Sequence, residues 1–232
     1  IFDKLKVPAF IRYIFQLGTV LFILKRSENF GNLISNLNNY ESLSFLLFLT
    51  IFGTAIINFI NFMDGLDGFI SLNLLLVLLF SAFSINNGIF FIVSSLIGFI
   101  FWNWAPAKIF MGDVGSTFLG ALLFGIIVNA ESIVTSLSVL VVIFPVLIDA
   151  CICVIRRFFR RQNIFEAHKK HLYQRLNQAG FSHSSVTLIY FTTSLMLLCC
   201  VLWVDINYIY LILLLVILIG YIIDKKFAIP FN

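Results

Sequence analysis

Residues 134–155 read VTSLSVLVVIFPVLIDACICVI, an apolar run whose length decides the fold class. The hydrocarbon core of a bilayer is about 30 Å thick, so a helix needs ~20 apolar residues to cross it. Pro145 lies inside the run and should kink the helix, because proline removes one backbone donor. Seven further runs are comparably apolar. The sequence therefore predicts about eight transmembrane helices, at 8–24, 43–60, 69–85, 89–104, 117–133, 134–155, 185–203 and 206–223.

The overall composition supports this fold class. Of the 232 residues, 61% are hydrophobic and only 11% are charged, and the mean hydropathy is +1.05. A soluble domain carries about 25% charged residues, so lipid must replace water around this chain. We expect an all-α integral membrane protein, a helical bundle forming one domain over residues 1–232, with the bilayer as its surroundings and no nucleic-acid partner. Because the chain starts at Ile1 rather than Met, we also expect that its N-terminus is missing; the family resemblance described below implies that the missing part includes helices.

The charges predict which side of the membrane each loop faces. With eight spans the loops alternate between two sides, and every Lys and Arg except Lys25 and Arg26 falls on one of them. By the positive-inside rule this side is cytoplasmic. The polar residues that could carry chemistry fall on the same side, namely Asp3, Asn61, Asp64, Asp67, Asp113, His168 and His171. The sequence thus predicts a polar site facing the cytoplasm.

The most informative motif is NFINFMDGLDG at residues 58–68. A carboxylate near the membrane is costly, at ~2.5–3.5 kcal/mol in its centre and less at the interface. At helical spacing Asn61, Asp64 and Asp67 would form a short polar spiral. Paired carboxylates beside an amide suit a hard cation such as Mg²⁺. The alternative is a solvated turn at a helix end.

A second motif, PAKIFMGDVGST at residues 106–117, leads into an apolar span. Glycines and Ser/Thr before a helix expose backbone N–H groups, which favour anions such as phosphate. Taken alone the motif is weak, because Gly and Ser also mark ordinary membrane turns.

A third stretch combines RRFFRR at residues 156–161 with EAHKKHLYQRL at residues 166–176. The arginines most simply anchor the chain at the interface with anionic lipid. We expect His168 and His171 to share a helix face with Arg175, where Arg and His⁺ could hold a diphosphate. A zinc pair is an alternative, but no third ligand is apparent. His183 is interpreted as a loop residue, and the four cysteines as small apolar side chains.

These three motifs, in this order, resemble the polyprenyl-phosphate N-acetylhexosamine-1-phosphate transferases. The EAHKKH form of the third motif is more similar to the O-antigen-initiating branch than to the peptidoglycan translocase. The family carries two adjacent aspartates, then an Arg and a Gln on the next helix. Here Asp3, Arg12 and Gln16 fit the second Asp and its partners, whereas Phe2 replaces the first Asp.

The resemblance implies transfer of an N-acetylhexosamine-1-phosphate from a UDP-sugar to undecaprenyl phosphate, with release of UMP, at the cytoplasmic face of a bacterial inner membrane. It also implies Mg²⁺ and, as in some members, a homodimer. The implied roles are catalysis by Asp3, Asp64 and Asp67, metal binding by Asp113 and Asp64, and substrate binding by Asn58, Asn61, Lys108, His168, His171 and Arg175. Two other classes stay open: a transporter with intramembrane acids, and a CDP-alcohol phosphotransferase, although its D-G-x-x-A-R continuation is absent.

Overall fold

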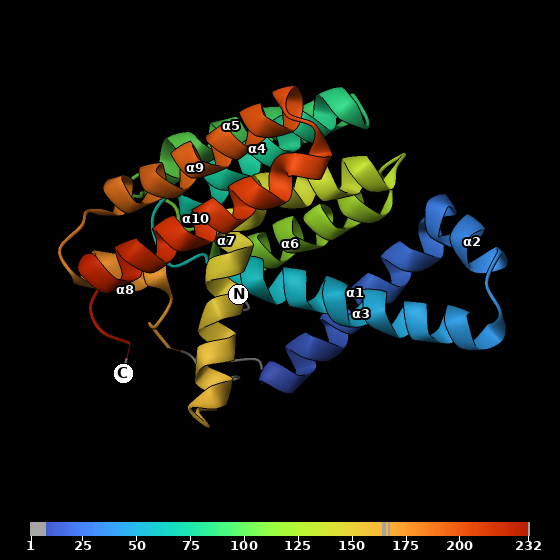
Figure 1. The fold of residues 1–232 in the computed structure, drawn as a ribbon, viewed down its shortest axis with the longest axis horizontal. Coiled ribbons are helices and arrows are strands. Elements are labelled where there is room, and N and C mark those ends of the chain that lie inside the picture. The colour runs from blue at the N-terminus through green and yellow to red at the C-terminus, as the bar shows by residue number, and fades with distance from the viewer. Residues whose placement is uncertain (1–7, 164–165, 167, 232) are drawn as a thin grey trace. The chain divides into compact units, whose positions relative to one another are not determined.

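The computed structural model of the protein describes residues 8–163, 166 and 168–231, and this part of the chain contains helices and no strand. Every one of the eight expected spans is a helix, and two short helices, α2 and α8, lie in the two long loops (Figure 1). The helices are α1 (Ala9–Arg26), α2 (Glu28–Ser35), α3 (Asn39–Phe62), α4 (Phe69–Ser84), α5 (Ile89–Asn103), α6 (Gly112–Val128), α7 (Ile133–Phe159), α8 (Leu172–Gln178), α9 (His183–Trp203) and α10 (Ile206–Lys226).

Length and composition divide these helices into groups. Helices α3, α7, α9 and the Tyr208–Lys226 part of α10 are long and apolar enough to cross a membrane, and α4, α5 and α6 are shorter apolar helices. The protein is therefore a polytopic helical membrane protein. The expected span 117–133 was placed too late, because α6 already begins at Gly112 and takes in the polar residues of the second motif.

The chain forms two compact units, which are described one at a time. The first unit comprises residues 1–61 and 111–137, and the second comprises residues 62–110 and 138–232. Helices α1, α2 and α6 and nearly all of α3 belong to the first unit. Helices α4, α5, α8, α9 and α10 and most of α7 belong to the second.

Small residues bring α3 and α6 together in the first unit. A Cβ atom added at Gly120 of α6 would lie 2.8 Å from the Cα atom of Ile57 in α3. One end of this unit joins Ser27 and Asn29 to the carbonyl groups of Val128 and Ala130. The other end brings the start of α1 to the start of α6, where Arg12 meets Asp113.

We expect Gly120→Ala to lower the stability of the first unit. The new methyl group would press on the backbone of Ile57, and overpacking of this kind costs about 1–3 kcal/mol. The matched control is Gly125→Ala on the same helix, where the nearest atom to the new Cβ is Ile23 Cγ2 at 3.9 Å. Thermal unfolding of the purified protein in detergent should show a lower midpoint for the first variant only. Equal midpoints would mean that α3 and α6 are not in close contact.

In the second unit α4 packs between α5 and α9 (Figure 1). The side chain of Ser194 in α9 donates to Asn73 of α4, at 3.2 Å, inside this contact. At the start of α4 the ring of Phe69 stacks on Tyr173 and meets Tyr190 edge-on. Three segments predicted to be cytoplasmic meet at this end of the unit, because Asp67 contacts both Ala107 and His183.

Candidate functional site

Asp113 is the centre of a polar cluster in the first unit. It lies in the first turn of α6, and its side chain is 51% exposed. One carboxylate oxygen accepts from Arg12 of α1 at 2.7 Å, and the other accepts from the amide of Asn61 in α3 at 3.2 Å. The same amide nitrogen lies 2.8 Å from the hydroxyl of Ser116. Three helices thus place a cation, an amide and a hydroxyl around one accessible carboxylate.

A second polar pair lies one helical turn away from this cluster. The amide of Asn58 donates to Gln16 at 2.8 Å, and Gln16 is almost fully buried. Gln16 lies one turn after Arg12 on α1, and Asn58 lies one turn before Asn61 on α3. The contact between α1 and α3 therefore carries polar residues in two successive turns. Arg12 and Gln16 thus lie beside the first motif, a contact that the sequence did not predict. Asp3 lies outside the described residues.

The expected polar spiral of Asn61, Asp64 and Asp67 is wrong. Helix α3 ends at Phe62, and both aspartates lie in the turn that follows. The physical reason is the pair of glycines in this turn: Gly68 has φ +71°, a left-handed conformation that other residues adopt at a cost. Gly65 is needed because a Cβ there would clash with the hydroxyl of Tyr173.

Asp67 connects this turn to two other segments of the second unit. Its carboxylate accepts from the backbone N–H of Ala107 at 3.1 Å and lies 3.2 Å from Nδ1 of His183. His183 is the first residue of α9, so its interpretation as a loop residue was wrong. Asp67 therefore fixes the position of the turn that carries Asp64. Asp64 is half-buried in the same unit, and its convergence with Asp113 stays a prediction.

Lys108 belongs to the loop that Asp67 holds. Its side chain is exposed, with Nζ 5.3 Å from the ring centre of Trp102. The loop is closed by the backbone N–H of Lys108, which donates to the carbonyl of Trp102 at 2.8 Å. Asn103 also ties the loop down, because it donates to Ile109 and accepts from Gly68 N–H. A cation on this fixed loop is accessible to an anionic ligand.

The two histidines of the third motif precede a helix and do not share a helix face. His171 is the residue before the first turn of α8, and His168 lies in the coil before it. Their rings nevertheless stack, with centres 4.9 Å apart. His171 is 1% exposed, and this burial, together with Arg157 and Arg175, lowers its pKa to about 4. The expectation of a protonated His171 is therefore wrong at neutral pH.

Asp149 of α7 fixes the start of α8, and sequence reasoning missed it. Its carboxylate accepts from the backbone N–H groups of Leu172 and Tyr173, at 2.8 and 3.1 Å, and from the hydroxyl of Tyr190 at 2.8 Å. The first N–H groups of a helix have no partner within the helix, so a carboxylate placed there caps it from outside. The available signal was a single acid within an otherwise apolar span.

We expect Asp149→Ala to destabilise the second unit strongly. The substitution leaves three buried donors without their acceptor, and hydrogen bonds to a charged group are worth about 1.5–3 kcal/mol each before relaxation. Tyr190→Phe removes only one of the three bonds and should cost about 1.5–3 kcal/mol. Thermal unfolding midpoints should therefore fall in the order wild type, Tyr190→Phe, Asp149→Ala. A larger effect of the tyrosine variant would contradict the capping role.

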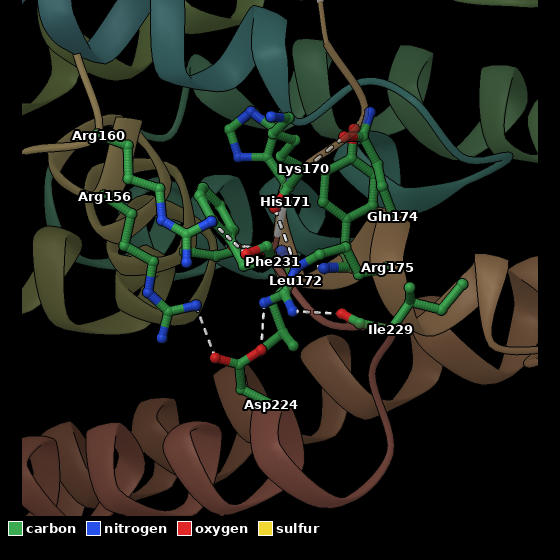
Figure 2. Close-up of polar contacts among 12 residues, drawn as sticks. Arg156, Arg160, Lys170, His171, Leu172, Gln174, Arg175, Asp224, Ile229 and Phe231 are labelled. Atoms are coloured by element: carbon green, nitrogen blue, oxygen red, sulfur yellow. Dashed lines mark hydrogen bonds and ion pairs between the residues drawn. The ribbon is translucent and has the colours of Figure 1, made fainter. Parts of the chain in front are cut away.

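Arg175 is anchored by protein oxygen atoms on all three of its guanidinium nitrogens (Figure 2). Nε donates to Lys170 O at 3.1 Å, Nη1 donates to Ile229 O at 2.7 Å, and Nη2 pairs with Asp224. The second oxygen of Asp224 pairs with Arg156 at 2.6 Å. Since Arg175 is only 4% exposed, its contacts fit the anchoring of the third motif to α10 and give no support to the expected diphosphate contact.

The donor set around Asp113 fits a hard cation. Its carboxylate is half exposed and supplies two oxygen ligands, which in this structure accept from Arg12 and from the amide nitrogen of Asn61. Mg²⁺ prefers such ligands, is commonly held by one or two carboxylates, and keeps several waters. Within the first unit Asp113 is therefore the residue best suited to hold the ion.

Comparison with known proteins gives a match to the family described as glycosyl transferase family 4 over residues 1–131. A probable undecaprenyl-phosphate N-acetylglucosaminyl 1-phosphate transferase of Bacillus subtilis (strain 168) is 37% identical over 106 residues, which is 43% of this chain and 29% of that protein. A decaprenyl-phosphate N-acetylglucosaminephosphotransferase of Mycobacterium leprae (strain TN) is 31% identical over 113 residues, which is 42% of this chain and 28% of that protein.

A shorter match involves the phospho-N-acetylmuramoyl-pentapeptide-transferase of Nocardia farcinica (strain IFM 10152). It is 49% identical over 57 residues, which is 25% of this chain and 14% of that protein. The chain thus covers less than a third of the length of each of these relatives, and none of their three names refers to O-antigen. The family match itself extends over more than half of this chain, from the first helix past the Asp113 cluster. The protein belongs to glycosyl transferase family 4.

Proposed function

We propose that the protein transfers an N-acetylhexosamine-1-phosphate from a UDP-sugar to undecaprenyl phosphate and so initiates a lipid-linked glycan of the cell envelope. In this reaction a phosphate oxygen of the lipid attacks the phosphorus that bears the sugar. A new diphosphate bond forms, the bond between the two phosphates of the donor breaks, and UMP leaves. The reaction joins a membrane lipid to a water-soluble nucleotide, so its site belongs at the cytoplasmic membrane surface.

The observation that supports the proposal most strongly is the cluster of Arg12, Asn61, Asp113 and Ser116. It lies inside the family match, and it places an accessible carboxylate beside a cation at one end of three apolar helices. Two polyanions must meet in the reaction, and positive charge is needed to stabilise their transition state. The relatives act on polyprenyl phosphates, according to their names, and this supports the acceptor class. It also favours the transferase over a transporter.

Mg²⁺ would be held by Asp113 and Asp64. When bound, the ion would neutralise charge that develops on the phosphates. Asp67 has a positioning role in this proposal, because its carboxylate is engaged by Ala107 and His183. It would hold the turn so that Asp64 faces the ion.

The remaining residues divide into substrate contacts and supports. Asp3 would orient or deprotonate the attacking lipid phosphate. Asn61 and the exposed Lys108 would contact the nucleotide sugar, and His168 would reach its diphosphate. Three residues act from within the protein: Asn58 through its bond to Gln16, His171 as the buried neighbour of His168, and Arg175 as the anchor of the motif. The O-antigen pathway is not part of the proposal.

The experiment is a transfer assay on membranes containing the 232-residue chain. Radiolabelled UDP-GlcNAc, undecaprenyl phosphate and Mg²⁺ should yield labelled lipid and an equal amount of UMP, and EDTA should stop both. The Bacillus subtilis relative serves as the positive control. Uptake of the label into vesicles without lipid product would identify a transporter, and use of a CDP-alcohol donor would identify the other phosphotransferase class. Either result would overturn the proposal.

A further inference from the structure

Three side chains of the kinds that bind metal ions lie together in the second unit, two from the third motif and one from α7. They are Cys153 of α7, His168 of the coil and His171 at the start of α8, and one ligand atom from each lies within 4.8 Å of the other two. Cys153 is 2% exposed and forms no disulfide. The cluster supplies the third ligand that the histidine pair lacked in the sequence, and it comes from a distant helix.

His171 gives an independent indication that a ligand belongs here. Its side chain is 99% buried, since 1% is exposed. Nδ1 of its ring has no hydrogen-bond partner among the described residues. A buried polar atom without a partner costs about 1–3 kcal/mol, and native structures rarely leave one. A lone pair directed at a bound ion would offset this cost.

We propose that Cys153, His168 and His171 form a binding site for a thiophilic transition metal ion, with Zn²⁺ as its occupant. Sulfur and imidazole nitrogen are the ligands that zinc prefers, at Zn–S ~2.3 Å and Zn–N ~2.0–2.1 Å. Mg²⁺ takes oxygen ligands, so this site differs in chemistry from the one centred on Asp113. Three protein ligands leave a fourth position of a tetrahedral zinc site for water or another ligand.

The geometry is close to what an ion needs. Ligands of one tetrahedral zinc ion lie roughly 3.3–3.6 Å apart, so the ligand atoms, now within 4.8 Å of one another, must approach by about 1 Å. The two stacked imidazole rings must also turn so that one nitrogen of each faces the ion. If Nδ1 of His168 is the ligand, it gives up the weak 3.3 Å hydrogen bond from the backbone of Lys170. The thiol of Cys153 must release its proton to the solvent on binding. Because Cys153 is only 2% exposed, the charge of the bound ion itself must stabilise the thiolate.

An ion at this site would join the third motif to α7 through Cys153. It would also occupy His168, which the proposed function gives to the diphosphate, and zinc would then inhibit transfer. That consequence rests on the proposed function. The existence of the metal site does not rest on the proposed function, so it is tested by metal binding and not by activity.

The test uses Co²⁺, a spectroscopic substitute for Zn²⁺, on the purified 232-residue chain in detergent. We expect one equivalent of Co²⁺ to produce a thiolate-to-cobalt charge-transfer absorption that Zn²⁺ then removes. Cys153→Ser should abolish this absorption, and Cys151→Ser, two residues away on α7, should keep it. His168→Ala should weaken Co²⁺ binding by at least about tenfold.

Stability measurements keep the result interpretable. Zn²⁺ should raise the unfolding midpoint of the wild type and of Cys151→Ser, and it should leave the midpoint of Cys153→Ser unchanged. If Cys153→Ser fails to fold, His168→Ala decides the question, since His168 is only half-buried. The absence of a charge-transfer absorption in the wild type, or an undiminished absorption in a folded Cys153→Ser protein, would overturn the proposal. If the wild type binds cobalt but shows no transfer activity, the proposed function is wrong and the metal site stands.

Discussion

Asp113→Asn should reduce UMP release by about 10²–10³-fold or more, the size of effect seen when one group that stabilises transition-state charge is removed. The amide is neutral, so it neither neutralises Mg²⁺ nor pairs with Arg12, which lies 2.7 Å from the carboxylate. Asparagine has nearly the same shape, and the site is half exposed, so folding should be little affected. The measurement is UMP release by membranes, normalised to the amount of protein in them.

The matched control for this variant is Glu131→Gln. Glu131 is exposed and lies just beyond the opposite end of α6, so the variant makes the same charge change away from the cluster. We expect it to leave turnover unchanged. Near-normal turnover in Asp113→Asn would refute the assignment of this residue as a metal ligand. Equal losses in both variants would indicate a general effect of negative charge.

Asp224→Ala should be among the most destabilising single substitutions in the second unit. It removes the carboxylate that pairs with Arg175 and Arg156 (Figure 2). Arg175 is 4% exposed, and a buried charge left without its partner costs about 3–5 kcal/mol. The midpoint of thermal unfolding should fall accordingly. Lys226→Ala, an exposed residue two positions further along α10, is the control and should have little effect.

A double-mutant cycle separates the pair from its surroundings. If the main cost of Asp224→Ala is the unpaired guanidinium, then Arg175→Ala combined with Asp224→Ala should cost less than the sum of the single effects.

The same variants also test the anchoring role of Arg175 against the expected contact with the diphosphate. An anchor lowers the unfolding midpoint and activity together, whereas a substrate contact lowers activity at an unchanged midpoint. Strict additivity of the two substitutions would show that the residues do not interact.

The helices could be predicted from the sequence because the bilayer imposes a length and a polarity on each span. All eight expected spans are helices, although α6 begins five residues before the expected position 117. The resemblance also singled out Arg12 and Gln16, although not the contacts that they make with Asp113 and Asn58. Each of these features can be recognised within one continuous segment of the chain, from the spacing of apolar residues or from a short motif.

What the sequence could not provide depends on contacts between distant segments. Asp149 looks like any acid in an apolar run until α8 is seen to start at its carboxylate. Helix α3 ends at Phe62, and Gly68 turns the chain into α4 with a positive φ, so helical spacing alone gave the wrong geometry for the aspartates. The isolation of His171 from water, which makes the ring neutral, depends on packing that no local pattern records.

The close approach of α3 and α6 has a consequence for how the sequence of the protein can vary. Gly120 lies against Ile57, and one turn beyond this contact Ser116 and Asn61 meet beside Asp113. The width of the gap between two backbones therefore sets the spacing of the groups that would meet the donor. A relative with a larger residue in place of Gly120 must hold the two helices further apart. Its polar residues at the positions of Asn61 and Ser116 must then be longer to meet, so we expect these three positions to change together during evolution.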